Sequence, residues 1–283
     1  MGTEWLTAPV HRRAGRPLSS PRRHLGAVLL VLPAVLTVAL FFGYPVARLL
    51  VESAEAGGAG HVRLIVADPL YRRVFWQTFR LAGYATAGCV LLGYPVAHLL
   101  ATAPRRWSAP GFALVLLPLW TSVLVRTYAW MILLGRNGII NRALLAAGLV
   151  EAPVPFMYNT LGVLIGMIHV LLPLMILPLY GVLRRIDPDL LRAAAGLGAS
   201  PLRVFRYVYL PLSVPGLFAG SVLIFILATG FYITPAIMGG GRVLTLAVLV
   251  EQQARRNIDF AGTLSGLLLV TTLLVFWAYS RAL

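Results

Sequence analysis

Six long apolar runs dominate this sequence and decide what the chain can fold into. Each exceeds the roughly 20 residues that an α-helix needs to cross the hydrocarbon core of a bilayer. Backbone polar groups in lipid must be satisfied within the segment, so helices are the expected secondary structure. The sequence therefore predicts an all-α polytopic membrane protein with six transmembrane helices. The runs are residues 25–50, 74–101, 110–134, 157–183, 209–238 and 261–283.

Composition supports the same class and excludes several chemistries. Hydrophobic residues make up 59% of the 283 residues, and charged residues only 12%. Every basic residue is Arg, so the chain has no lysine for a Walker A phosphate loop. It has no HExxH, CxxC or GxSxG motif, and its single cysteine, Cys89, is predicted to be a small buried hydrophobe. We therefore expect no catalytic residue, metal site or cofactor in this chain.

The net charge of +15 is spread along the chain rather than gathered in one domain. The arginines therefore indicate lipid headgroup contacts and membrane topology, and no nucleic-acid partner is expected. With the N-terminus inside, the inner segments hold more arginines than the outer ones, so both termini are predicted to be cytoplasmic. Residues 1–24 are predicted to be a basic flexible tail, and residues 25–50 a retained first transmembrane helix.

The stretch between the fourth and fifth runs carries two helix-start signals. Asp187-Pro188 and Ser200-Pro201 each place a capping residue before a proline at the first helical position. A helix over about 188–197 would end at Gly198, and a second helix would continue into the fifth run. The first helix is rich in alanine and glycine, which would let a partner approach closely. The alternative is an ordinary alanine-rich surface helix, because alanine is the best helix former.

This stretch resembles the EAA motif of permeases from ATP-binding-cassette (ABC) importers. Ala193-Ala194 match its two alanines, Gly198 matches its glycine, and Leu210-Pro211 close it at the right spacing. Residues 116–141, 164–191 and 226–240 resemble the spermidine/putrescine-type branch, the PotB family. The resemblance covers about residues 74–283 and implies a type I ABC importer transmembrane domain of five helices, with a cytoplasmic coupling element at 187–206.

The resemblance also implies which residues dock on an ATPase. The motif's glutamate position is occupied here by Arg192, so the charged contact of the family must be lost, replaced or matched by an altered partner. The predicted docking residues are those of the motif and its neighbours on the two helices, including the nearby Arg203 and Phe205. They are Arg192, Ala193, Ala194, Gly198, Ala199, Pro201, Arg203, Phe205, Leu210 and Pro211.

The partners and location follow from the same resemblance. They are two ABC ATPase subunits that bind ATP and Mg, a second and homologous but non-identical permease, and an external solute-binding protein. The chain would be a transport subunit, not an enzyme, in the bacterial inner membrane, with a polyamine (spermidine or putrescine) or a related amine or amino-acid-like compound as the solute. An ion-coupled secondary transporter would need acids within its spans, and a membrane enzyme would need clustered His, Asp or Glu; both remain alternatives.

Several polar and aromatic residues within the apolar runs are candidates for the solute path. Arg126 is a charge inside the third run, which points to a pathway or to pairing with another helix. Tyr128 and Trp130 suit an aromatic belt at the membrane surface or a cation-binding face. His169 suits either a packing role or the path. Residues 229–235 are predicted to break the fifth run and to form a candidate gate that includes Tyr232 and Thr234.

Overall fold

The computed structural model describes residues 21–281, which fall into two units that divide between Val51 and Glu52. The first unit is helical from α1 (Pro21–Val38) through a π-helix, η1 (Ala39–Gly43), into α2 (Tyr44–Glu55). Its run Leu30–Glu55 is long and apolar enough to cross a membrane. Residues 1–20 of the predicted tail lie outside the described residues. Residues 21–24, predicted to be flexible, belong to α1 instead, because Pro21 opens a helix that continues into the apolar run.

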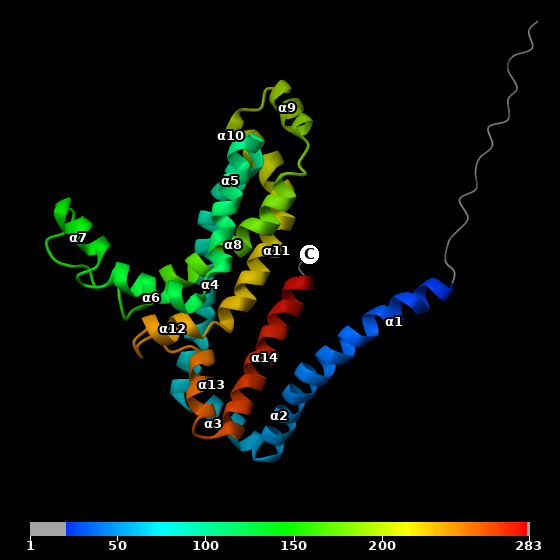
Figure 1. The fold of residues 1–283 in the computed structure, drawn as a ribbon, viewed down its shortest axis with the longest axis vertical. Coiled ribbons are helices and arrows are strands. Elements are labelled where there is room, and N and C mark those ends of the chain that lie inside the picture. Colours follow the sequence, from blue (N-terminus) through cyan, green and yellow to red (C-terminus); the bar gives the residue numbers. More distant parts are fainter. Residues whose placement is uncertain (1–20, 282–283) are drawn as a thin grey trace, which may run out of the picture. The chain divides into compact units, whose positions relative to one another are not determined.

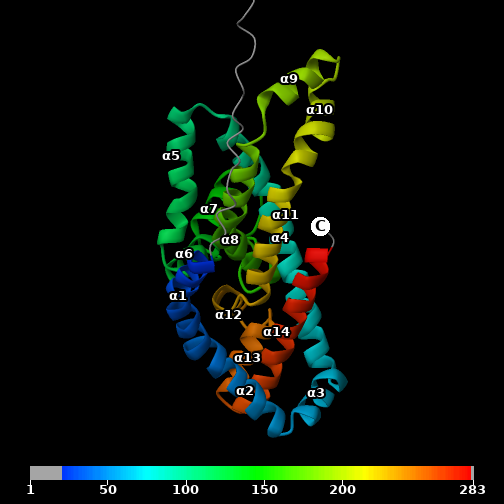
Figure 2. The same cartoon turned by 90° about the vertical axis from the view of Figure 1, so that its right-hand side faces the viewer.

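Three long helices form the centre of the second unit. They are α4 (Pro69–Thr102), α8 (Thr160–Leu183) and α11 (Leu210–Thr229), which run side by side in both views (Figures 1 and 2). Small buried residues line these helices, including Ala85 and Cys89 on α4 and Gly220 on α11. Small side chains let helix backbones approach closely in lipid, where packing rather than water exclusion drives association. The prediction that Cys89 is buried is confirmed.

A second hydrophobic cluster lies at the end of this unit farthest from α9 (Figures 1 and 2). It joins α3 (Gly58–Ala67), α13 (Leu246–Ala254) and α14 (Ile258–Arg281) to the start of α4. Thr78 fixes this junction, because its buried hydroxyl accepts the backbone N–H of Leu246 at 2.8 Å. The cluster therefore holds the first turns of α4 and α14 together.

The third predicted span is not one helix. α5 (Arg105–Leu116) and the 3₁₀ turn η2 (Leu117–Trp120) precede α6 (Val123–Leu134) and α7 (Ile139–Ala146), and the two halves meet at 100°. The prediction of a continuous span over 110–134 is therefore wrong. Pro118 cannot donate a helix hydrogen bond, and Thr121 and Ser122 adopt extended backbone angles, so the helix must restart. The described residues contain five membrane-length helices, or six if this bent pair crosses as one.

The fifth predicted span is also interrupted. Its helix begins at Pro201, as the second helix-start signal predicted, with α10 (Pro201–Val204) and the π-helix η3 (Phe205–Tyr209) leading into α11. α11 ends at Thr229, and α12 (Ile233–Met238) follows after Gly230. The prediction of a break within 229–235 is confirmed. Glycine at 230 disfavours a helix because its backbone has the most conformational freedom, and Pro235 has no N–H to donate. The segment therefore interrupts the helix readily.

Candidate functional site

The predicted coupling element forms a projecting elbow, defined here as residues 187–211. It comprises α9 (Pro188–Gly196), a short turn, α10, η3 and the first residues of α11. In both views α9 and α10 lie beyond the ends of α4 and α8, at the opposite end from α3 and α13 (Figures 1 and 2). The elbow is thus a separate structure between two core helices rather than a simple loop.

Local sequence explains why the elbow has this shape. The Asp187 carboxylate accepts the N–H of Asp189 at 2.9 Å, so it caps the start of α9 as predicted. Gly198 has a φ of +85°, a left-handed conformation that glycine adopts without strain. The N–H of Ala199 reaches back to the carbonyl oxygen of Ala194 at 3.2 Å and closes the turn. The two predicted helices and the glycine turn are confirmed, although α9 ends at Gly196, one residue earlier than predicted.

The elbow presents small and apolar groups to its surroundings. Leu197, at the tip, is 90% exposed, and Leu202 is 74% exposed. Such exposure of large apolar side chains is typical of a surface that a partner covers. Of the predicted docking residues, eight are exposed or half-buried within 192–205, and the last two lie at the start of α11: Arg192, Ala193, Ala194, Gly198, Ala199, Pro201, Arg203, Phe205, Leu210 and Pro211.

Arg192 has a partner on its own helix. Its Nη1 lies 2.7 Å from Oδ1 of Asp189, one turn earlier, and both side chains are mostly exposed. An exposed pair of this kind adds little stability, about 0.3–0.5 kcal/mol. The substitution of arginine at the glutamate position therefore leaves no unpaired buried charge, and it changes the charge pattern of the surface instead.

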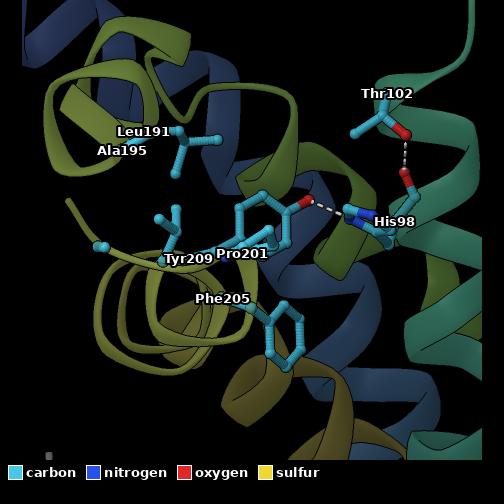
Figure 3. A pocket seen from close by; sticks show the side chains of 9 residues that line it. His98, Thr102, Leu191, Ala195, Pro201, Phe205 and Tyr209 are labelled. Atoms are coloured by element: carbon cyan, nitrogen blue, oxygen red, sulfur yellow. Dashed lines mark hydrogen bonds between the residues drawn. The ribbon is translucent and has the colours of Figure 1, made fainter.

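An apolar hollow of about 520 Å³ lies beneath the elbow (Figure 3). Leu191 and Ala195 line the hollow from α9, and the end of α4 closes it. Pro201 of α10 and Phe205 of η3 line it from the other side of the elbow. Here Tyr209 and the Nδ1 of His98 share a hydrogen bond of 2.8 Å, and their rings meet edge to face. This contact ties the π-helix η3 to α4.

Sequence reasoning missed the contact between His98 and Tyr209. The two residues are 111 positions apart, and His98 has no sequence signal beyond being a histidine in an apolar helix. The π-helix that places Tyr209 was also not predicted. A π-turn is often found at functional sites, and here it lies directly between the elbow and the core.

A second group of interest is the Arg126 cluster, defined as Arg126, Thr127, Trp130, His169 and Thr234. Trp130 donates its indole N–H to Nδ1 of His169 at 3.0 Å. The hydroxyls of Thr127 and Thr234 lie 3.3 Å apart and join α6 to α12. Arg126 is only 8% exposed, and its Nε and Nη1 have no hydrogen-bond partner among the described residues.

The structure brings together only some of the predicted path residues. Arg126, Trp130, His169 and Thr234 belong to one region of α6, α8 and α12. Tyr128, on another face of α6, is 55% exposed and outside the cluster. Tyr232 precedes α12 and is half-buried, with no hydrogen bond that would join it to the group. Sequence reasoning missed Thr127, which has no distinguishing pattern of its own.

Comparison with known proteins identifies the family. The family model described as "Binding-protein-dependent transport system inner membrane component" matches residues 90–281. The chain belongs to this family. It is therefore a multi-pass inner-membrane permease subunit of an ABC importer, and ATPase and solute-binding subunits are the partners that such a permease requires.

Individual relatives agree with this family. The spermidine/putrescine transport system permease protein PotB of Haemophilus influenzae is 37% identical over 218 residues, 76% of each chain. A putative 2-aminoethylphosphonate transport system permease protein, PhnU of Salmonella paratyphi A, is 33% identical over 254 residues, 86% of each chain. Among solved structures, a bacterial alginate ABC transporter chain superposes with a TM-score of 0.73 over 92% of this chain and 94% of its own, at 15% identity. That last likeness concerns the fold alone.

The fold and the family together account for the arrangement of the second unit. The family match includes the core helices α8 and α11, the elbow and α14. The described residues contain no cluster of three or more His, Cys, Asp or Glu side chains that could hold a metal ion. The two regions of chemical interest described above are the projecting elbow and the buried Arg126 cluster.

Proposed function

We propose that this chain forms one half of the solute path of an ATP-driven importer for small aliphatic amines, with polyamines as the first class to test. The single observation that carries the coupling role is the elbow. It is rigidly capped, projects beyond the helix core and joins α8 to α11 on either side. A push on α9 is therefore transmitted directly to two of the three core helices.

The orientation belongs to the same proposal. The elbow faces the cytoplasm and docks in a groove of an ATPase subunit, which supplies ATP and Mg. Both termini are cytoplasmic, and a second, homologous permease completes the path. The chain itself catalyses no reaction. The distribution of arginines supports this orientation, because the elbow and its flanks hold Arg184, Arg185, Arg192, Arg203 and Arg206.

The solute class rests on the relatives. Spermidine/putrescine permeases and a putative aminophosphonate permease share an aliphatic amine in the solutes that their names give. Uptake by the assembled importer, with its own solute-binding protein, would test putrescine, spermidine and aminophosphonates side by side. Failure of every amine to stimulate ATP hydrolysis would overturn this part of the proposal.

The docking role is tested by Ala194→Trp. Ala194 is half-buried on α9, and a tryptophan there adds bulk where a partner must approach closely. We expect the variant to lose most co-purification with the ATPase subunits while it remains folded in detergent. The readout is the ATPase-to-permease ratio after affinity purification.

A matched control separates docking from general damage. Arg136→Trp adds the same bulk at an exposed position between α6 and α7, far from the elbow along the chain. We expect this variant to retain the full ATPase ratio. Equal retention by both variants would mean that the elbow is not the ATPase contact.

A further inference from the structure

The Arg126 cluster contains a charged group with two N–H donors that no described residue satisfies. Arg126 is more than nine-tenths buried, and its Nε and Nη1 lack any hydrogen-bond partner among the described residues. A buried guanidinium without a partner is costly, and charged residues inside membrane spans usually serve a pathway or a partner. The Nε and Nη1 donors of Arg126 are therefore available to a group outside the described residues.

Among the neighbours of Arg126, His169 offers a donor, the threonine hydroxyls can accept, and none is an acid. His169 accepts the Trp130 indole N–H through Nδ1, so the neutral imidazole carries its proton on Nε2 and offers a donor there. The Thr127 hydroxyl already donates to the carbonyl oxygen of Val123 at 2.8 Å. No Asp or Glu occurs in α6, α8 or α12. The cluster is therefore rich in unused N–H groups and holds no acid.

The position of the cluster in the fold adds a second reason. Arg126 lies in the first turn of α6, a half-helix of 12 residues that restarts after the 100° bend. The N-terminus of a helix carries partial positive charge. In membrane transporters, interrupted helices of this kind direct their N-termini toward acidic groups of solutes. Charge and helix polarity thus favour the same kind of ligand.

We propose that the Arg126 cluster is a subsite for the anionic group of the transported solute, a carboxylate or a phosphonate. Arg126 supplies a charge-assisted pair of N–H groups, and His169 supplies a third donor from α8. The subsite opens to the solute when α6 and α12 separate, because the two helices meet at Thr127 and Thr234 and each follows a break.

This inference rests on the proposed function and narrows its solute class. A purely cationic polyamine would be repelled by Arg126, whereas an amine that also carries an acid would be held by it. The inference therefore assigns this permease to zwitterionic amines. An aminophosphonate is one example, and a short ω-amino acid is another.

A matched pair of small molecules tests the subsite directly. Putrescine and 4-aminobutanoate have nearly the same length and share one amine, but they differ in carrying a second amine or a carboxylate. The measured quantity is the thermal unfolding midpoint of the assembled permease–ATPase complex in detergent, without the binding protein. We expect 4-aminobutanoate and 2-aminoethylphosphonate to raise the midpoint and putrescine to leave it unchanged.

Variants then assign the effect to Arg126. We expect Arg126→Gln to weaken binding of the two acidic probes about 10- to 100-fold, the usual value of hydrogen bonds to a charged group. Arg126→Lys keeps the charge and should weaken binding of these probes less, because it removes only the paired N–H donors of the planar guanidinium. Arg136→Gln removes an exposed arginine between α6 and α7 and serves as the matched control, with unchanged binding.

Several outcomes would overturn the subsite. One is an equal shift by putrescine and 4-aminobutanoate in the wild type, a comparison that needs no variant to fold. Another is dissociation of the two permeases in Arg126→Gln, which would make Arg126 the partner of an acid on the second permease. Uptake of putrescine that Arg126→Gln leaves intact would also reject the subsite, while the proposed importer function would stand. If no amine of either kind stimulates ATP hydrolysis, the proposed solute class fails instead.

Discussion

Replacing Gly198 with valine should uncouple this permease from its ATPase. Gly198 has a φ of +85°, and a β-branched residue is strained there whatever space surrounds it. Strain of about 1–3 kcal/mol would depopulate the turn between α9 and α10. Because the turn sets the angle of α9, we expect ATPase affinity to fall about 10- to 100-fold. Binding of the purified ATPase to the permease in nanodiscs measures this loss.

Gly196→Ala is the control for this experiment. Gly196 lies two residues away, at the end of α9, in helical geometry, and a Cβ added there meets no atom within 4 Å. Alanine favours a helix over glycine by about 1 kcal/mol, so the helix should be slightly more stable. We expect ATPase binding close to that of the wild type. Equal loss in both variants would show that surface bulk, rather than backbone angle, controls docking.

The second large effect is expected at Gly216, where α11 crosses α8. A Cβ on Gly216 would lie 2.9 Å from Cβ of Val182 and 3.1 Å from the backbone Cα of Leu179. The backbone atom cannot move aside, so Gly216→Leu must push the two helices apart. We expect a destabilisation of about 3 kcal/mol, at the upper end for overpacking. The thermal unfolding midpoint should fall by on the order of 10 °C.

Gly181→Leu provides the matched comparison for Gly216. Gly181 lies on α8, close in sequence to Val182, but it is exposed and an added Cβ meets nothing within 4 Å. We expect its unfolding midpoint to match or exceed that of the wild type, because glycine is the poorer helix former. A comparable loss of stability in both variants would mean that the α8–α11 contact does not limit stability.

The elbow was the part of this protein most accessible to sequence reasoning. Its features are local: a capping aspartate before a proline, a glycine at a left-handed position and a spacing that fits a known motif. Each acts within a few residues, so the linear pattern was sufficient. The hollow beneath the elbow was not predictable, because His98 and Tyr209 meet only after α4 packs against η3.

The apolar runs had a similar strength and limit. Their length and hydropathy predicted membrane helices correctly, since crossing lipid demands about 20 apolar residues. Apolar composition, however, does not show where the axis of a helix bends. Pro118 and the extended residues after it turn the third run by 100°, and Gly230 interrupts the fifth. Of the two helix breaks that place α6 beside α12, the sequence therefore predicted only the one in the fifth run.

By itself, the sequence determined the class of this protein, the position of its long helices, the capped elbow and the family to which it belongs. The class, the helices and the elbow depend on hydropathy and capping chemistry, which act over short distances along the chain, and the family follows from the resemblance of the motif residues. Only the tertiary structure decided that Arg126 is buried near the Trp130–His169 pair, with no hydrogen-bond partner for its Nε and Nη1 among the described residues. The cost of burying a charge depends on which atoms surround it, and those atoms come from helices that are distant in sequence.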